Sequence, residues 1–132
     1  MSQSDPVADF LTRIRNAQRA GHRYVDIRAN KLVQKMADVL KEANFVEHIL
    51  VRTEGVNQEM RVFLKYGPKR RPIISTLRRV SSPGARRYIS ADRIPSIRNG
   101  LGMVILSTSQ GVMSGQKARQ MQLGGEYLCY VW

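Results

Sequence analysis

Hydroxyl and glycine residues gather in one uncharged stretch of the sequence, "LSTSQGVMSGQ", at residues 106–116. A serine there could act as a nucleophile, a glycine-rich loop could hold a phosphate, and neutral hydroxyls could hydrogen-bond to a polar ligand. A nucleophilic serine needs a base, and both histidines of the chain lie in its first half. Ser109 has Gly111 two residues after it but Ser107 two residues before it, so the Gly-x-Ser-x-Gly pattern of hydrolases is incomplete. We therefore expect no catalytic serine.

The other enzymatic patterns are missing as well. A Walker A loop needs a lysine where Gln116 stands. Cys129 is the only cysteine, and no histidine stands at a spacing that would complete a zinc site. The second half of the chain has two acids, Asp92 and Glu126, and these form no catalytic pair in sequence. The sequence predicts no enzyme, no metal and no cofactor, and the hydroxyl stretch is interpreted as a recognition element.

The charge of the chain predicts a polyanionic partner. The 132 residues include 22 Lys and Arg against 10 Asp and Glu, a formal net charge of +12. Residues 1–66 carry +3, whereas residues 67–132 carry +9. We expect nucleic acid rather than a membrane, because the basic half has no long amphipathic helix and no apolar run reaches the ~18 residues of a membrane span. The N-terminus lacks the order of a secretory signal, so we expect a soluble intracellular protein.

Apolar periodicity predicts an α+β fold that begins with an N-terminal α/β domain, residues 1–68, of two helices packed on a three-stranded sheet. Asp5 and Asn30 are the expected N-caps of the helices. The two longer strands should form an antiparallel hairpin across a turn-prone segment at residues 53–58. His48 lies in the first of these strands and is interpreted as structural. The expected helices are 6–20 and 31–44, and the expected strands are 24–28, 45–52 and 59–66.

The segment "GPKRRP", residues 67–72, indicates the boundary to a C-terminal β-rich domain, residues 69–132, with a short helix. Ser114 is the expected cap of that helix, which should carry Ala118 and Met121 and end at a glycine pair. The expected strands are 85–89, 101–109 and 126–132, with a turn at 81–84. Strand alternation would place on one face of the last strand the residues Glu126, Leu128, Tyr130 and Trp132.

A basic segment with an aromatic residue inside it suits nucleic-acid binding. From Lys69 to Arg98 there are nine basic residues and one acid, Asp92, with Tyr88 among them. Arginines around a tyrosine can bind phosphates beside a stacked sugar or base, although Tyr88 could instead only pack. Glu126 could accept hydrogen bonds from a base or a 2′-hydroxyl, and the alternative is a salt bridge to a nearby arginine. Glycines near the hydroxyls would let a ligand approach the backbone closely.

Four segments in order, "DPVADFLTRIRNA", "VSSPGARRY", "GLGMVILSTSQGVMS" and "GGEYLCYVW", closely resemble the bacterial small-subunit ribosomal protein family numbered eight. The resemblance covers essentially the whole chain. It implies primary binding to the central domain of small-subunit ribosomal RNA, a role in subunit assembly, and a place in the cytoplasmic or organellar ribosome. It also implies neighbouring small-subunit proteins, notably those numbered five and twelve, and in some bacteria repression of the protein's own mRNA.

The resemblance also implies which residues contact RNA. In the C-terminal domain the candidates are Ser107, Thr108, Ser109, Gln110, Gly124, Gly125, Glu126, Tyr88, Arg86, Arg87, Ser81, Pro83, Gly84 and Arg79. The family's first helix approaches a second RNA helix, and the N-terminal candidates are Arg13, Arg15, Asn16 and Lys31. The chain departs from the family at Ser82, where a basic residue is usual, and near Gly115, where an acid is usual. The three basic residues within the segment 67–72 could compensate for the missing positive charge at Ser82.

Two other function classes compete with this interpretation. A general basic nucleic-acid-binding protein without specificity for ribosomal RNA would make almost all its contacts with phosphates. A small hydrolase using Ser109 would need an ester-cleaving activity that depends on that residue.

Overall fold

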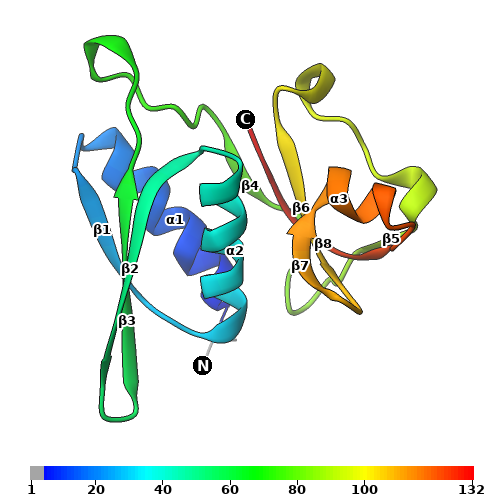
Figure 1. The fold of residues 1–132 in the computed structure, drawn as a ribbon, viewed down its shortest axis with the longest axis horizontal. Helices are drawn as coiled ribbons and strands as arrows, with labels where there is room; N and C mark the ends of the chain where they lie inside the picture. The colour runs from blue at the N-terminus through cyan, green and yellow to red at the C-terminus, as the bar shows by residue number, and fades with distance from the viewer. Residues whose placement is uncertain (1–4) are drawn as a thin grey trace. The chain divides into compact units, whose positions relative to one another are not determined.

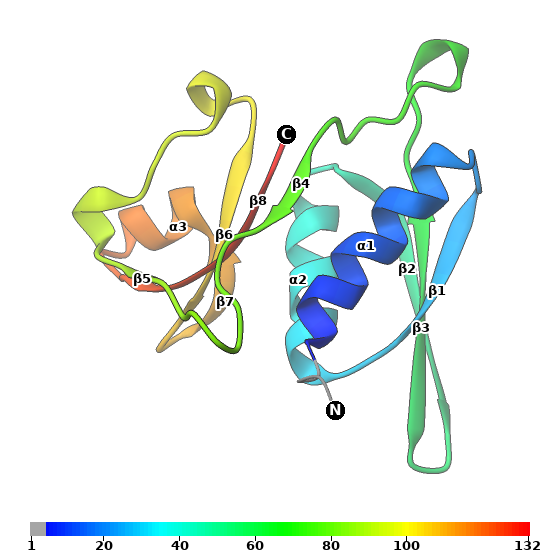
Figure 2. The same ribbon diagram turned by 180° about the vertical axis from the view of Figure 1, so that it is seen from behind.

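The computed structural model describes residues 5–132, which divide into two compact units. The N-terminal unit is Asp9–Ile74, and the C-terminal unit is Ser75–Trp132 together with residues 5–8. Residues 67–72 thus belong to the N-terminal unit, while the domain boundary expected at residue 68 stays a prediction. Figures 1 and 2 show the chain from opposite sides.

The first part of the chain forms two helices and a three-stranded antiparallel sheet of order β1-β3-β2. Both helices lie on the same side of this sheet (Figure 1). Asp5 and Asn30 cap the helices, since their side chains accept the N–H groups of Ala8 and Val33 at 3.2 and 2.8 Å. The elements are α1 Pro6–Arg19, β1 Tyr24–Arg28, α2 Lys31–Glu42, β2 Val46–Glu54 and β3 Asn57–Leu64.

The core of this part follows the predicted apolar spacing. Buried residues recur three and four positions apart along each helix, and every second residue from Met60 to Leu64 is buried in the central strand. The fully buried side chains include Phe10, Leu11, Ile14, Val33, Met36, Leu40 and Met60. The predicted α+β layering of two helices on three strands is confirmed.

The hairpin of β2 and β3 is longer than expected. The strands pair as far as Glu54 and Asn57, so the turn contains only Gly55 and Val56 instead of residues 53–58. Gly55 has a φ of +60°, and this left-handed conformation, which glycine adopts without strain, allows a two-residue turn. His48 is exposed on the sheet, where its ring centroid lies 5.9 Å from that of Phe63.

The C-terminal unit is an antiparallel β structure with one short helix. Its strands follow the order β4-β8-β6-β7, and β5 pairs with β8 as well. The helix packs over a cluster of Ile94, Val104, Leu106, Met113 and Ala118. The elements are β4 Leu77–Arg79, β5 Tyr88–Ile89, β6 Met103–Thr108, β7 Gly111–Ser114, α3 Gly115–Gln120 and β8 Gly125–Val131. Short 3₁₀ turns occupy Pro68–Arg70, Ala91–Arg93 and Arg98–Gly100.

The hydroxyl stretch is a tight hairpin rather than an open loop. Ser107 and Thr108 end strand β6, a turn holds only Ser109 and Gln110, and strand β7 follows at once. The sequence did not predict β7, because a run of four residues is too short to show strand periodicity.

Two further expectations for the C-terminal unit were wrong in detail. A register shift between Ile105 and Leu106 leaves Leu128 as an extra residue in β8, so Tyr127 and Tyr130 pack on the same cluster and strict alternation fails there. Helix α3 is capped by Ser114 as expected but ends at Gln120, before the glycine pair, and Met121 is exposed. No helix within residues 5–132 is long and apolar enough to span a membrane.

Candidate nucleic-acid interface

Three of the expected contact residues lie in one row across the C-terminal sheet. Glu126 on β8 pairs with Tyr88 on β5 and with Ser107 on β6. Residues directly opposite each other on antiparallel strands share a face and lie close together. Ser107 is also opposite Val112 on β7, which extends the row to a fourth strand. The sheet therefore brings together side chains that come from three distant segments of the sequence.

The three consecutive hydroxyls have different environments. The Thr108 hydroxyl donates to the carbonyl of Gly111 at 2.8 Å and accepts the N–H of Gln110 at 3.1 Å, so it closes the turn. Ser109 is exposed in the turn and Ser107 is half-buried beside it. Neither serine hydroxyl has a hydrogen-bond partner among residues 5–132. These two hydroxyls are available to an external ligand, whereas that of Thr108 is already used.

The Glu126 carboxylate holds the turn that carries the basic residues. Its side chain is only 13% exposed, and it accepts the Ser81 hydroxyl at 2.5 Å and the Arg86 guanidinium at 3.2 Å. Ser81 is fully buried and its oxygen also accepts the backbone N–H of Arg87 at 3.2 Å. The salt bridge that was the alternative interpretation of Glu126 is present. A carboxylate has about four acceptor positions, so it retains capacity for another donor.

The glycine pair is required by the protein's own packing. A Cβ atom on Gly125 would lie 2.2 Å from the carbonyl oxygen of Ser107, and one on Gly124 would lie 2.5 Å from that of Ile89. These positions accept only glycine, because the clashing atoms belong to the backbone of neighbouring strands. The glycines therefore allow β8 to approach the hydroxyl hairpin and β5, a role that sequence reasoning assigned to ligand approach.

The turn at residues 81–84 is ordered and partly exposed. Ser82 and Ala85 exchange two backbone hydrogen bonds of 3.2 and 3.1 Å around Pro83 and Gly84. Beyond it Arg86 and Arg87 are exposed, and Tyr88 is 73% exposed. An exposed tyrosine next to two arginines can stack on a sugar or base while the guanidinium groups bind phosphates.

Neighbouring arginines on β4 differ in their use. Arg79 donates to the carbonyl of Leu128 at 2.9 Å and to the Asp5 carboxylate at 3.4 Å, and its side chain is 15% exposed. The Arg78 side chain is exposed and makes no ion pair or hydrogen bond with any residue from 5 to 132. Because successive residues of a strand point to opposite faces, Arg78 and Arg79 face different sides of the sheet that β4 forms with β8. Arg78 is thus a cation that sequence reasoning missed, and Arg79 stabilises the fold.

The N-terminal candidates lie on helices of the other part of the chain. Arg13 forms an exposed ion pair with Asp9, with Nε and Oδ2 2.9 Å apart. Asn16 and Lys31 are exposed, and Arg15 is half-buried. They therefore belong to the other compact unit, and whether they contact a ligand stays a prediction.

The excess positive charge is divided more evenly between the two compact units than between the two halves of the sequence. Asp9–Ile74 contains 14 basic and 7 acidic residues, a charge of +7, and the remainder of the chain contains 8 and 3, a charge of +5. The excess that sequence reasoning placed in the second half includes Lys69, Arg70 and Arg71, which belong to the N-terminal unit. Both units therefore carry enough positive charge to attract a polyanion.

The titratable groups in the C-terminal sheet do not suggest catalysis. Burial raises the pKa of the Cys129 thiol to about 12, so it stays protonated and unreactive at neutral pH. Burial, followed by the neighbouring Tyr130, raises the pKa of Tyr127 to about 12 as well. No cluster of three or more potential metal ligands occurs in the described part of the chain, residues 5–132.

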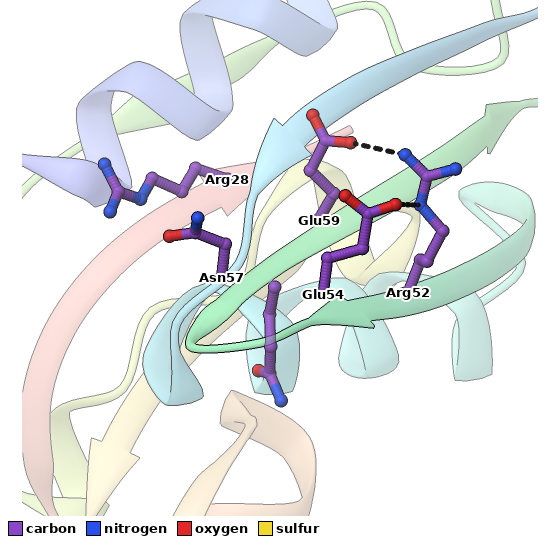
Figure 3. Close-up of a pocket in the computed structure, with 6 residues that line it drawn as sticks. Arg28, Arg52, Glu54, Asn57 and Glu59 are labelled. Atoms are coloured by element: carbon purple, nitrogen blue, oxygen red, sulfur yellow. Dashed lines mark hydrogen bonds and ion pairs between the residues drawn. The ribbon is translucent and has the colours of Figure 1, made fainter.

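A cavity near the tip of the β2–β3 hairpin is lined by residues of mixed charge (Figure 3). Arg52 contacts Glu54 and Glu59, each at 3.5 Å, and Arg28 lies apart from these pairs. Because two carboxylates neutralise the arginine here, this surface does not suit a polyanion. We assign no ligand to it.

Comparison with known proteins gives one consistent result. The family model described as "Ribosomal protein S8" matches residues 5–132. The chain is 50% identical over 133 residues to "Small ribosomal subunit protein uS8" of Protochlamydia amoebophila, covering 100% of both chains. It is also 50% identical to the uS8 protein of Chlamydia trachomatis serovar D, over 98% of this chain and 97% of the relative. The uS8 protein of Anaeromyxobacter sp. strain K is 46% identical over the full length of both.

Proposed function

Because the chain belongs to the ribosomal protein S8 family, we propose that its C-terminal sheet binds the central domain of small-subunit ribosomal RNA. Members of this family are structural constituents of the small ribosomal subunit and not enzymes. The protein accordingly functions in the ribosome, in association with small-subunit RNA and other ribosomal proteins. The proposal concerns which part of the RNA it binds and through which residues.

The observation that supports this site is the row of Tyr88, Glu126 and Ser107 on three paired strands. At one end of the row stands an exposed aromatic ring, and at the other end two serine hydroxyls have no partner within residues 5–132. Short hydroxyls can approach base edges and ribose hydroxyls more closely than lysine or arginine side chains can. The row thus offers stacking and neutral hydrogen bonding at one place.

The arginines around the row would supply attraction without selectivity. Arg86 and Arg87, next to Tyr88 in sequence, are exposed, and contacts of guanidinium groups with phosphates carry little sequence information. The neutral hydroxyls would then test the shape of the RNA at close range. This division of roles distinguishes the proposed protein from a general basic nucleic-acid binder, whose affinity would come from phosphate contacts alone.

Three further parts of the proposal rest on the family resemblance. Bound at this position, the protein would help to assemble the central domain and would contact the small-subunit proteins numbered five and twelve. An mRNA that presents the same RNA shape would compete for the same row, and this would allow repression of the protein's own message. The N-terminal residues Arg13, Arg15, Asn16 and Lys31 would contact a second RNA helix.

A competition assay tests the proposal. Ser109→Ala and Ser107→Ala each remove one unpaired hydroxyl, and Ser96→Ala is the matched control because Ser96 is exposed on a connecting segment of the same unit. Each site variant should lose about 2- to 12-fold in affinity for the folded ribosomal RNA fragment, the range expected for one hydrogen bond. The dependence of affinity on salt should not change, since no cation is lost.

Two results would defeat the proposal. Equal affinity of the wild-type protein for duplex DNA and for the folded ribosomal RNA fragment would support the general basic binder. Wild-type affinity in both serine variants would show that the hydroxyls are not part of the site. Footprinting of the full small-subunit RNA should show that the wild-type protein protects its central domain. This protection should be weaker with the Ser107→Ala/Ser109→Ala double variant.

A further inference from the structure

A group of three adjacent cations in the N-terminal unit remains without a role. Lys69, Arg70 and Arg71 are all exposed, in the loop that follows strand β3. Their side chains make no ion pair or hydrogen bond with any residue from 5 to 132. In Figure 1 this loop is the green projection beyond the end of β3, opposite the β2–β3 turn. We call residues 68–71 the basic loop.

Three exposed arginines of the same unit are paired with carboxylates, whereas Arg19, Arg23 and Arg28 are exposed singly and form no ion pair within residues 5–132. Arg13 is paired with Asp9, Arg61 with Asp26, and Arg52 with two glutamates. The basic loop has no acidic neighbour of this kind and contributes three charges to a unit of +7. Three like charges in sequence repel one another, and an external anion relieves this repulsion.

The basic loop is held in one conformation by its own backbone. The N–H of Gly67 donates to the carbonyl of Arg71 at 2.7 Å, and that of Ile73 donates to the carbonyl of Lys65 at 3.1 Å. The Tyr66 hydroxyl donates to the carbonyl of His22 at 2.5 Å, which ties the start of the loop to the segment between α1 and β1.

The two central residues, Lys69 and Arg70, have φ values of +60° and +58°, in the left-handed region that favours glycine. Two charged residues are thus kept where glycine would be less strained. A loop closed in this way loses little backbone conformational freedom when it binds a ligand, so it is preorganised for binding.

We propose that the basic loop binds the phosphate backbone of RNA, as a site separate from the row on the C-terminal sheet. Lysine and arginine side chains displayed on a fixed loop position a protein on RNA through phosphate oxygens and read no base. The positive charge of both units favours a polyanion, and RNA is the polyanion that the proposed function brings to this protein. The inference rests on the proposed function and adds a second anchoring point to it.

The salt dependence of binding tests the inference. Lys69→Gln/Arg70→Gln removes two charges while keeping polar, unbranched side chains at the two positions of positive φ. The control Lys35→Gln/Lys41→Gln removes two charges from exposed positions of α2 in the same unit. Against full small-subunit RNA, the loop variant should lower the slope of log affinity against log salt by about 1.8, since each duplex phosphate contact contributes about 0.9. The control should leave the slope unchanged.

A proximity experiment gives an independent readout. Cys129 is fully buried, so an iron–EDTA group can be attached selectively at an introduced Arg70→Cys, with Lys41→Cys as the control. Hydroxyl radicals from position 70 should cleave the RNA in the complex, and those from position 41 should not. Absence of cleavage from position 70, together with an unchanged slope in the glutamine variant, would overturn the inference.

The outcomes separate this inference from the proposed function. If the serine variants lose selectivity but the loop variant binds like the wild type, the row stands and the basic loop fails. If the wild type shows no preference for ribosomal RNA, the proposed function fails, while a reduced slope in the loop variant would still assign phosphate binding to the loop. An effect of the loop variant only when other ribosomal proteins are present would make the loop a protein contact and overturn the RNA assignment.

Discussion

The two sheets of this protein use carboxylates in different ways. On the N-terminal sheet, Asp26 accepts two hydrogen bonds from Arg61, at 2.8 and 3.1 Å, and both side chains are exposed. On the C-terminal sheet, Glu126 is almost buried and joins Ser81 to Arg86. An exposed pair mainly neutralises surface charge, whereas a buried carboxylate that accepts several bonds fixes the groups around it.

The comparison indicates that side chains are held in fixed positions on the C-terminal sheet rather than on the N-terminal sheet. Removal of the exposed pair should leave the N-terminal sheet almost unchanged. The C-terminal row depends instead on three features that support one another: a closed interior around Cys129, glycines that allow close strand approach, and the bond between Ser81 and Glu126. Four predictions examine this contrast, from the largest expected effect to the smallest.

Cys129 reports how tightly the C-terminal sheet is closed. Since burial raises the pKa of its thiol from 9.0 to about 12, the thiolate fraction at pH 8 should fall by about 1,000-fold. Alkylation of the folded protein by iodoacetamide should slow by at least that factor relative to the protein in 6 M guanidinium chloride. A folded-state rate within tenfold of the unfolded rate would show that the sheet opens readily, which would contradict the contrast.

Gly125→Ala should destabilise the protein by about 3 kcal/mol, because the new Cβ would lie 2.2 Å from the backbone oxygen of Ser107 and neither strand can move aside. Urea unfolding measures the change. Gly84→Ala is the matched control, since a Cβ there meets nothing within 4 Å, and its effect should stay within about 0.5 kcal/mol. Similar stability of the two variants would mean that the strands are not closely apposed at Gly125.

Ser81→Ala should cost about 1–3 kcal/mol, because it removes a buried hydroxyl that serves both Glu126 and the N–H of Arg87. Ser82→Ala, at the neighbouring half-buried serine, should change the free energy of unfolding by less than about 0.5 kcal/mol. A double-mutant cycle of Ser81→Ala with Glu126→Ala should give a coupling of about 0.5–3 kcal/mol. Zero coupling would contradict a supporting role for the carboxylate.

The sequence predicted those features that depend on neighbouring residues. The helix caps at Asp5 and Asn30, the apolar spacing of both helices and the strand Tyr24–Arg28 follow from local patterns. The salt bridge of Glu126 was foreseen as an alternative, because few other carboxylates were available in the basic half.

Features that depend on pairing between distant strands were not predicted. The extra residue Leu128 in β8 and the bond between Ser81 and Glu126, 45 residues apart, follow from strand register, and no local pattern specifies it. Strand register also determines that Arg79 is used inside the fold while Arg78 is exposed. The charge balance likewise depended on which compact unit includes the basic loop.

The smallest effect is expected at the exposed pair of the N-terminal sheet. Hydrogen bonds from Arg61 hold the pKa of Asp26 below its ordinary value of 3.8. The carboxylate therefore contributes stability above about pH 3.8, and this contribution is lost as the pH falls through its lower folded-state pKa. Asp26→Asn should lower Tm by about 1–2 °C at pH 7, in keeping with an exposed ion pair.

Acid and salt should both abolish that difference, for separate reasons. Once the pH has fallen through the lowered folded-state pKa of Asp26, the wild-type carboxylate is protonated in both the folded and the unfolded chain, so its Tm should approach that of Asp26→Asn. In 1 M NaCl the attraction is screened within about 3 Å, and the two proteins should again converge. Glu59→Gln, which removes a looser contact of 3.5 Å with Arg52, should shift Tm less than Asp26→Asn does. If Asp26→Asn destabilised the protein as much as Ser81→Ala does, and salt did not change this, the exposed carboxylate would also be fixing its sheet. The contrast between the two sheets would then fail.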